Sequence, residues 1–262
     1  MESPPLARFL HSLGKVQHHL HTVVVGLSAV EKGIATKPDD LDIAWKAHDT
    51  VGSAREARRF LLRATLIFVA EELNEYATRI LQYRALATDG LALPEHRAER
   101  IKTLAQPHDI DPTFLTVAPL IVCHWRNRIV HRNSNARLTA AERQRLAAQS
   151  ESVRDSYKGI DVQRLLQDFE EDHPTLKDVT VLLAMSVRFV RQVDSKLSEP
   201  TSSVDVRQWL DAEALLTEVL ELEKEAANGG HPDARRRAKQ YLLTKAPGLA
   251  EAYYVHGAGR DR

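Results

Sequence analysis

The sequence predicts an all-α protein, an up-and-down helical bundle followed by a C-terminal helical hairpin. Along most of the chain, apolar residues recur every three or four positions, as they do on one face of an α-helix. Alternating β-branched runs and the Asn-Gly or Asp-Gly pairs of tight hairpins are almost absent. Hydrophobic residues make up 43% of the 262 residues, so the chain can bury a core.

The first two helices are predicted over Leu6–Lys32 and Gly52–Ala87, with ATKPDD as the loop between them. The second helix has an apolar stripe with a period near 3.6, formed by Leu62, Leu66, Val69, Leu73, Tyr76, Ala77 and Ile80. Gly and Pro in TDGLALP end this helix, and a short helix follows over Glu95–Ala105. Thr113 is the expected cap of a longer helix that runs to about Arg132.

The next break is RNSNAR, because Asn and Ser compete with the helical backbone for hydrogen bonds. Thr139 and Glu142 then form a capping-box pattern for a short helix. Another short helix is predicted over Asp161–Glu171. Pro174 suits the first position of a helix that runs to Leu197.

A domain boundary is predicted at SEPTSS, Ser198–Ser203, whose small and polar residues suit a linker. Residues 1–198 would form the helical bundle. Residues 204–262 would form a hairpin of two helices, Val204–Ala227 and Pro232 to about His256, split by NGG. The hairpin has no feature beyond a balanced composition, so we expect it to be an interaction element.

Charge and cysteine content narrow the class of protein. Lys plus Arg and Asp plus Glu number 36 each, which argues against a surface covered in positive potential but does not exclude a local basic patch. Cys123 is the only cysteine, which fits a reducing compartment. The N-terminal MESPPLARFL lacks the features of a signal peptide, and the apolar runs are too short to span a membrane. We therefore expect a soluble, cytoplasmic protein.

The stretch CHWRNRIVHRN, which starts at Cys123, has an arginine among the apolar residues of a helix. At about 100° per residue, Arg126 falls inside the apolar arc. Arginine keeps its charge, and an unpaired buried charge is costly, so Arg126 needs a carboxylate, a bound anion or an interface cleft. Asn127 and His131 lie one turn apart at the edge of this helix, within reach of the long Arg126 side chain.

Two interpretations of this stretch are open. Arg126 can pair with a carboxylate of another helix, while His131 stabilises the C-terminal end of its own helix, where a cation is favoured. Alternatively, Arg126, Asn127 and His131 act together at one site. The order Arg-Asn-x-x-x-His favours the second interpretation.

RNRIVH, residues 126–131, resembles the Arg-x4-6-His signature of the HEPN domain family, in which a polar residue usually follows the arginine directly. The position of this stretch on a late helix, after a long early helix, is also similar to the family. The segment HPTLKDVTVLLAMSVRFVRQVDSKL would be the closing helix. The resemblance covers roughly residues 50–198.

This resemblance implies a metal-independent endoribonuclease that needs no cofactor and acts in toxin–antitoxin pairs, phage defence or RNA processing. Arg126 would bind the scissile phosphate, and His131 would transfer protons. Asn127 would orient His131 or hold a phosphate oxygen. The RNA 2′-hydroxyl would attack its own phosphate, which leaves a 2′,3′-cyclic phosphate and a 5′-hydroxyl. The implied partners are RNA, an antitoxin or defence-system protein, and a second copy of the chain whose motif helix faces the first across a shared cleft.

The family often has an acidic or polar residue on an early helix near the motif, and AEELNE in the long helix offers candidates. Glu72 falls at the edge of the apolar stripe, whereas Glu71 points away from it. Glu72 is therefore the expected partner of Arg126. It can equally be an ordinary boundary residue that pairs with Arg79.

Basic residues flank the motif and could follow an RNA backbone, namely Arg128, Arg132 and Arg137. A solvated helix end explains these three residues nearly as well. No metal-ligand set is predicted, because the histidines near the N-terminus lack a neighbouring carboxylate or cysteine. Two alternatives to the enzyme stay open: a non-catalytic HEPN-like module that binds RNA, a nucleotide or a partner, and a plain helical scaffold.

Overall fold

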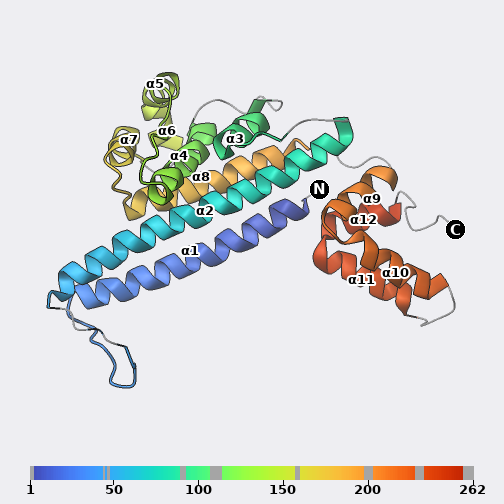
Figure 1. The fold of residues 1–262 in the computed structure, drawn as a ribbon, viewed down its shortest axis with the longest axis horizontal. Helices are drawn as coiled ribbons and strands as arrows, with labels where there is room; N and C mark the ends of the chain where they lie inside the picture. Colours follow the sequence, from blue (N-terminus) through green and yellow to red (C-terminus); the bar gives the residue numbers. More distant parts are fainter. Residues whose placement is uncertain are drawn as a thin grey trace. The chain divides into compact units, whose positions relative to one another are not determined.

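The fold is that of a computed structural model, which describes residues 3–43, 45, 48–88, 93–106, 114–156, 160–197, 203–227 and 233–255. Within these ranges every regular element is an α-helix, which confirms the all-α prediction (Figure 1). The helices in chain order are α1 (Pro4–Glu31), α2 (Thr50–Thr88), α3 (Arg97–Ala105), α4 (Phe114–Val130), α5 (Ala140–Ala148), α6 (Ser150–Ser156), α7 (Val162–Glu170), α8 (Leu176–Ser195), α9 (Ser203–Ala212), α10 (Leu216–Ala227), α11 (Ala234–Lys245) and α12 (Pro247–Val255).

The chain divides into two compact units, and α1, α2 and α8 contribute residues to both of them. The first unit consists of Met1–Leu10, Asn74–Ile110 and Val190–Arg262. The second consists of His11–Leu73 and Asp111–Phe189. The boundary predicted at Ser198 stays a prediction, and in this division the C-terminal helices cluster with parts of earlier helices.

In the first unit, contacts between α2 and the end of α9 explain this clustering. The ring of Tyr83 stacks on that of Trp209, with 4.4 Å between the ring centroids. Arg79 Nη1 donates a hydrogen bond to the carbonyl oxygen of Ala212 at 2.9 Å. Glu213 accepts hydrogen bonds from the Tyr83 hydroxyl and from Arg8. Burial, followed by the nearby Glu213 carboxylate, raises the pKa of Tyr83, so its hydroxyl stays protonated and keeps donating.

The C-terminal region forms four short helices and not the two that the sequence predicted. The first break follows α9, where Ala214 has a φ of 55° and its N–H bonds to the carbonyl of Asp211. These contacts are typical of a helix C-terminus. The second break precedes α12, which begins at Pro247, because proline suits a first helical position and not a helix interior. NGG lies outside the described residues.

In the second unit, α1 and the first part of α2 lie side by side as an antiparallel hairpin (Figure 1). Arg55 and Arg58 of α2 both pair with Glu31 at the end of α1, at 2.9 and 3.0 Å. All seven residues of the apolar stripe predicted for α2 are buried, which confirms its helical period.

The predicted helix starts are observed in part. The capping box of α5 is present, since the Glu142 N–H bonds to Thr139 Oγ1 at 3.2 Å and Glu142 Oε2 accepts from the Thr139 N–H at 2.7 Å. The prediction that Pro174 begins the next helix is wrong. α8 starts at Leu176, because Thr175 and Asp178 exchange the same pair of capping hydrogen bonds. The predicted cap Thr113 and most of the predicted linker lie outside the described residues.

Candidate functional site

The Arg-Asn-x-x-x-His stretch lies at the C-terminal end of α4, in the second unit. The apolar face of this helix is fully buried at Cys123 and Trp125. Arg126 and Asn127 are partly buried, whereas His131 is exposed just beyond the last turn. The His131 N–H still bonds to the Asn127 carbonyl at 2.9 Å, so the helical backbone fixes the spacing of these two residues.

Arg126 contacts three side chains. Its Nε donates to Glu71 Oε1 at 2.9 Å. Its Nη1 lies 3.4 Å from Asn127 Oδ1 and 3.3 Å from His131 Nε2. The Asn127 amide therefore accepts from Arg126, so it holds the guanidinium rather than His131. Because a guanidinium can only donate, the contact with His131 is a hydrogen bond only when Nε2 carries no proton.

The carboxylate beside Arg126 belongs to Glu71 and not to Glu72, the partner that the sequence predicted. The helical wheel gives the direction of each glutamate relative to the apolar stripe of α2. It does not show on which side of that stripe α4 packs. The two long side chains meet at the margin of the contact, where Arg126 is 13% exposed and Glu71 43% exposed. A pair so open to solvent is weaker than a buried one.

The three flanking arginines have different surroundings. Arg128 lies with its guanidinium carbon 4.1 Å from the centre of the Phe169 ring, and it also donates to the Phe169 carbonyl on α7. Burial lowers the pKa of Arg128, although the nearby Asp172 carboxylate opposes this. The structure thus uses Arg128 to join α4 to α7. Arg132 and Arg137 are exposed, as an RNA contact would require.

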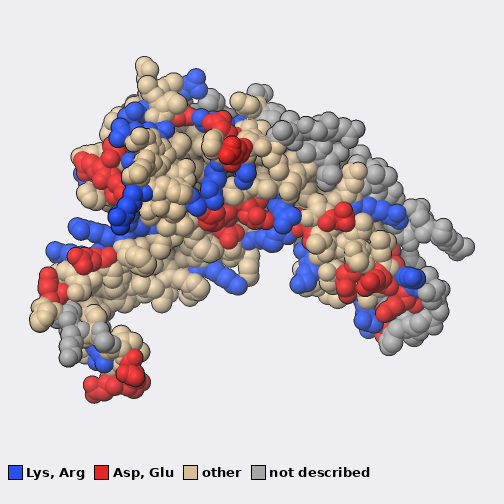
Figure 2. Space-filling model, in the orientation of Figure 1, with Lys and Arg blue, Asp and Glu red and all other residues tan. Residues whose placement is uncertain are grey.

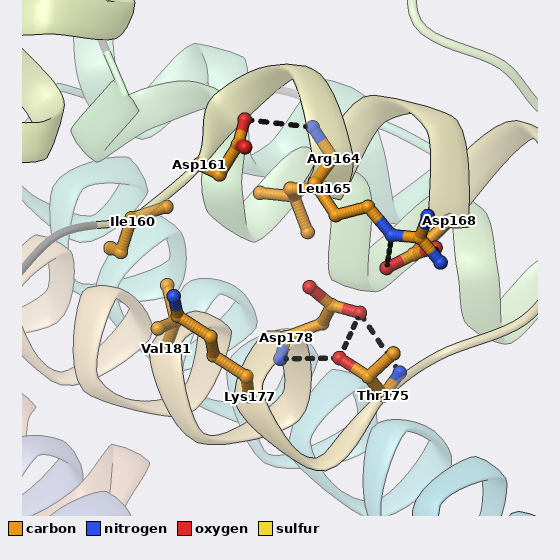
Figure 3. Close-up of a pocket in the computed structure, with 9 residues that line it drawn as sticks. All are labelled: Ile160, Asp161, Arg164, Leu165, Asp168, Thr175, Lys177, Asp178 and Val181. Carbon is orange, nitrogen blue, oxygen red and sulfur yellow. Dashed lines mark hydrogen bonds and ion pairs between the residues drawn. The ribbon is translucent and has the colours of Figure 1, made fainter.

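A small cavity of about 110 Å³ lies between α7 and α8 and is lined by two buried carboxyl groups, those of Asp168 and Asp178 (Figure 3). Arg164 pairs with Asp168 at 2.8 Å, and the Thr175 hydroxyl donates to Asp178 at 2.6 Å. Burial raises the pKa of Asp178, and the neighbouring Asp168 carboxylate adds to this, while Thr175 opposes it.

Sequence reasoning missed this carboxyl pair. The Thr175–Asp178 capping pattern was a signal that could have located one member. Nothing in the spacing of the chain indicates that Asp168, on a different helix, approaches it. Arg164 donates to Asp168 and Thr175 donates to Asp178, so the pair is part of the packing between α7 and α8.

Within the described ranges, no three or more His, Cys, Asp and Glu side chains are placed so that they could hold a metal ion. The helices there also lack the combination of length and apolar character that a bilayer crossing needs. Comparisons with protein-family models, curated proteins and solved structures found no match to this chain.

Proposed function

We propose that this protein is a metal-independent endoribonuclease whose reaction site contains Arg126 and His131, with Asn127 and Glu71 as positioning residues. The observation that carries the proposal is the 3.3 Å contact between Arg126 Nη1 and His131 Nε2 at an exposed helix end. For the 2′-hydroxyl of RNA to attack its own phosphate, a cation that binds phosphate and a group that moves protons must reach the same phosphodiester, and this contact holds the two close together. The resemblance of residues 126–131 to the HEPN signature supports the same reaction.

In this reaction, His131 Nε2 takes the proton of the 2′-hydroxyl, and the 2′-oxygen forms a bond to phosphorus. Arg126 stabilises the negative charge that develops on the phosphate oxygens. The bond to the 5′-oxygen breaks, and that oxygen leaves with a proton from water or from a protonated His131 in a second copy of the chain. The products are a 2′,3′-cyclic phosphate and a 5′-hydroxyl.

The direct test is cleavage of a mixed RNA pool by the purified protein in EDTA. We expect cyclic-phosphate ends, with rates about 100-fold to 10,000-fold lower in His131→Ala and Arg126→Ala. His19→Ala and Arg154→Ala, which change an exposed histidine and an exposed arginine elsewhere in the second unit, serve as matched controls. Thermal unfolding of each variant separates a lost reaction from a lost fold. A wild-type protein that cuts nothing, or folded variants that cut like wild type, would overturn the proposal.

One observation favours a second candidate, a non-catalytic module that binds RNA, a nucleotide or a protein. The nitrogen that a base would use, His131 Nε2, lies 3.3 Å from Arg126 Nη1, which can occupy its lone pair, whereas the guanidinium keeps donors for a phosphate oxygen. The module would bind single-stranded RNA and leave it intact. Filter binding and cleavage measured on one labelled RNA distinguish the two candidates, because only the enzyme changes the length of the RNA.

For the cellular role, we propose control by an antitoxin or a defence-system protein in the cytoplasm. Expression of the wild-type chain alone would then slow growth, and His131→Ala would remove that effect. Equal growth with both chains would contradict this role without bearing on the chemistry, which the RNA assay tests separately.

A further inference from the structure

Two of the six phenylalanines are exposed to solvent, and both lie on α2. Phe60 is 75% exposed and Phe68 is 40% exposed. The other four are no more than 1% exposed, namely Phe9, Phe114, Phe169 and Phe189. Burial stabilises a phenylalanine ring, and the chain uses this stabilisation everywhere except on α2. The two exposed rings therefore set one surface of α2 apart from the rest of the chain.

The exposed rings share one ridge of α2, the aromatic ridge. Four residues follow one another on it at spacings of four, four and three positions, namely Phe60, Ala64, Phe68 and Glu71. Residues at these spacings are neighbours on a helix surface. Leu62, which is 3% exposed, lies about 200° around the helix from Phe60, so the ridge faces away from the apolar stripe of α2.

The aromatic ridge leads to the proposed reaction site. Glu71, at its end, accepts a hydrogen bond from Arg126 at 2.9 Å. Phe68 lies about 4.5 Å before Glu71 along the helix axis, and Phe60 lies about 12 Å before Phe68. Stacked nucleotides rise about 3.4 Å each, so roughly three or four nucleotides span the distance between the rings. A strand with one phosphate at Arg126 can therefore extend along the ridge past both rings.

Basic side chains line a hollow beside the aromatic ridge. The hollow has a volume of about 270 Å³ and lies between α2, α7 and the segment that joins α7 to α8. Three arginines line it, Arg59 and Arg63 from α2 and Arg164 from α7. Arg63 follows Phe60 by three positions, so the hollow and the ridge are neighbours on the surface of α2.

Two of these three arginines are paired with carboxylates. The carboxylates that line the hollow are those of Asp168, Glu171 and Asp172. Arg63 pairs with Asp172, and Arg164 pairs with Asp168 at 2.8 Å. Arg59 is exposed and makes no ion pair with a described residue. Figure 2 shows basic atoms gathered along the N-terminal part of α2. Arg59 is therefore the arginine of the hollow that can bind a phosphate without breaking an ion pair.

We propose that the aromatic ridge binds unpaired bases of single-stranded RNA, with one base stacked on Phe68, another on Phe60, and a backbone phosphate on Arg59. Every base has a flat face that can stack on an aromatic ring, so such a surface accepts many sequences. Pairing and stacking within a duplex hide these faces, so the ridge selects single strands. An exposed ring alone would suit a protein partner equally well, but an unpaired arginine beside the ring favours a polyanion.

This inference deepens the proposed function and rests on it, because it takes RNA as the ligand that reaches Arg126. It adds the class of substrate, an unpaired strand that extends from the reaction site along α2 toward Phe60. The rings would position the strand and take no part in the transfer of protons.

The first experiment measures binding of a short 2′-O-methyl RNA strand by fluorescence anisotropy. This strand lacks the attacking hydroxyl and stays intact. We expect Kd to rise about 5-fold to 150-fold in Phe60→Ala and in Phe68→Ala, the range for the loss of one stacked base. Phe60→Trp and Phe68→Trp should bind at least as tightly as wild type, because indole also stacks. Val25→Ala is the matched control, because it removes a 69% exposed apolar side chain from α1 of the same unit.

The second experiment uses an abasic strand, which has the same phosphates and no bases. Wild type, Phe60→Ala and Phe68→Ala should bind this strand equally, because nothing can stack. Arg59→Ala should weaken binding of both strands and reduce the slope of log K against log salt by about 0.7, the value for one phosphate contact with a single strand. Thermal unfolding verifies that each variant is folded.

Three results would overturn the proposal. The phenylalanine variants could bind the intact strand as tightly as wild type does. They could lose the same affinity for the abasic strand as for the intact one. The wild type could bind no strand, in which case a change of self-association in Phe60→Ala, measured by sedimentation equilibrium, would assign the ridge to a protein contact.

Failure of the aromatic ridge is distinguishable from failure of the proposed reaction. Cleavage that is lost in His131→Ala, combined with strand binding that does not depend on the two rings, would keep the reaction site and reject the ridge. Strand binding that depends on Phe60 and Phe68, without cleavage of ordinary RNA, would keep the ridge and reject the ribonuclease.

Discussion

The guanidinium of Arg126 is shared between two kinds of partner, a carboxylate on α2 and two polar side chains at the C-terminal end of α4. A guanidinium has five N–H donors, so these three contacts leave donors for a phosphate oxygen. Glu71 and Asn127 hold the group in one orientation before any phosphate arrives. Their role can therefore be separated from that of Arg126 itself.

Glu71→Gln removes the charge of the carboxylate while it keeps the shape of the side chain. We expect kcat for RNA cleavage to fall about tenfold, the effect of weakening one charged hydrogen bond that positions the guanidinium. KM should not rise, because the positive charge that binds phosphate is still present. Glu72→Gln is the matched control and should leave kcat and KM unchanged. Equal effects of the two variants would show that Glu71 does not position Arg126.

Asp178→Asn tests the buried carboxyl pair. Burial and the neighbouring Asp168 raise the pKa of Asp178 above its ordinary 3.8. A raised folded-state pKa means that the contribution of this group to stability is complete below the unfolded value and is lost as pH rises through the folded value. The Asn side chain of the variant does not ionise, so its stability does not fall in this way as pH rises. The difference in Tm between wild type and variant should therefore shift in favour of the variant from about pH 4 to about pH 7. A difference that does not change with pH would contradict the assignment.

A contact between two side chains could be predicted from the sequence only where both residues lie on one helix. Arg126, Asn127 and His131 lie within six positions of one helix, so their spacing follows from helical geometry. The contact between Arg126 and Glu71 depends on how α2 and α4 pack, and a wheel for one helix does not contain that information. The pairing of Asp168 with Asp178 depends on packing in the same way.

At the scale of elements, α4 and α7 are joined by one aromatic ring. Phe169 meets Trp125 edge to face, with 5.4 Å between ring centroids, and the guanidinium of Arg128 lies over the Phe169 ring. Phe169 and Trp125 are fully buried, so these contacts are shielded from water. This contact between α4 and α7 gives Arg128 a structural role, whereas Arg132, one turn later, is exposed.

Arg128→Ala should therefore reduce stability more than RNA binding. We expect a loss of about 1–2 kcal/mol in the free energy of unfolding, from the contact with the ring and the hydrogen bond to the Phe169 carbonyl. Arg132→Ala should cost less than about 0.5 kcal/mol, although it should weaken RNA binding and lower its salt dependence. Urea denaturation and filter binding measure the two effects. The reverse ranking of the two variants in stability would contradict this role of Arg128.

The helix starts show which local signals can be relied on. Thr139→Ala should lower the free energy of unfolding by about 1 kcal/mol, because the first turn of α5 loses its cap. Thr139→Ser keeps a hydroxyl oxygen and should restore most of the loss. A cost equal for both substitutions in urea denaturation would mean that the threonine methyl group, and not the cap, stabilises this end.

The predictable helix ends are those set by a side chain within four residues, such as the capping box of α5. The extra breaks in the C-terminal region were harder to predict. Ala214 adopts a positive φ without the glycine or asparagine that usually indicates one. Pro247 was a visible signal for the start of α12. It interrupts the single helix that the sequence predicted from Pro232 to about His256.

At the scale of the whole molecule, the predicted C-terminal hairpin is part of a larger unit. Trp209 of α9 is 8% exposed and stacks on Tyr83 of α2. The composition of residues 198–203 is typical of a linker and indicated a domain boundary. Composition does not reveal that a residue after the linker contacts a helix before it. In the first unit, part of the core that buries Trp209 comes from Tyr83 of α2.

Trp209→Ala should accordingly cost about 3–5 kcal/mol in the free energy of unfolding, the range for removing a buried aromatic side chain. Trp45→Ala removes a tryptophan that is 36% exposed, and it should lower the free energy of unfolding by less than about 1 kcal/mol. Urea denaturation in dilute solution compares the two. A small cost at Trp209 would mean that the C-terminal helices unfold without affecting α2.

The contact between Arg126 and His131 has a consequence for the timing of the proposed reaction. When Nε2 of His131 carries no proton, its lone pair is already engaged by Arg126 Nη1 in the free protein. A phosphate that draws the guanidinium toward itself releases this lone pair at the moment when a 2′-hydroxyl arrives beside it. The Arg126 guanidinium would thus occupy His131 Nε2 in the absence of RNA and release it when RNA binds. The exposed histidine would then act as a base only when its substrate is present.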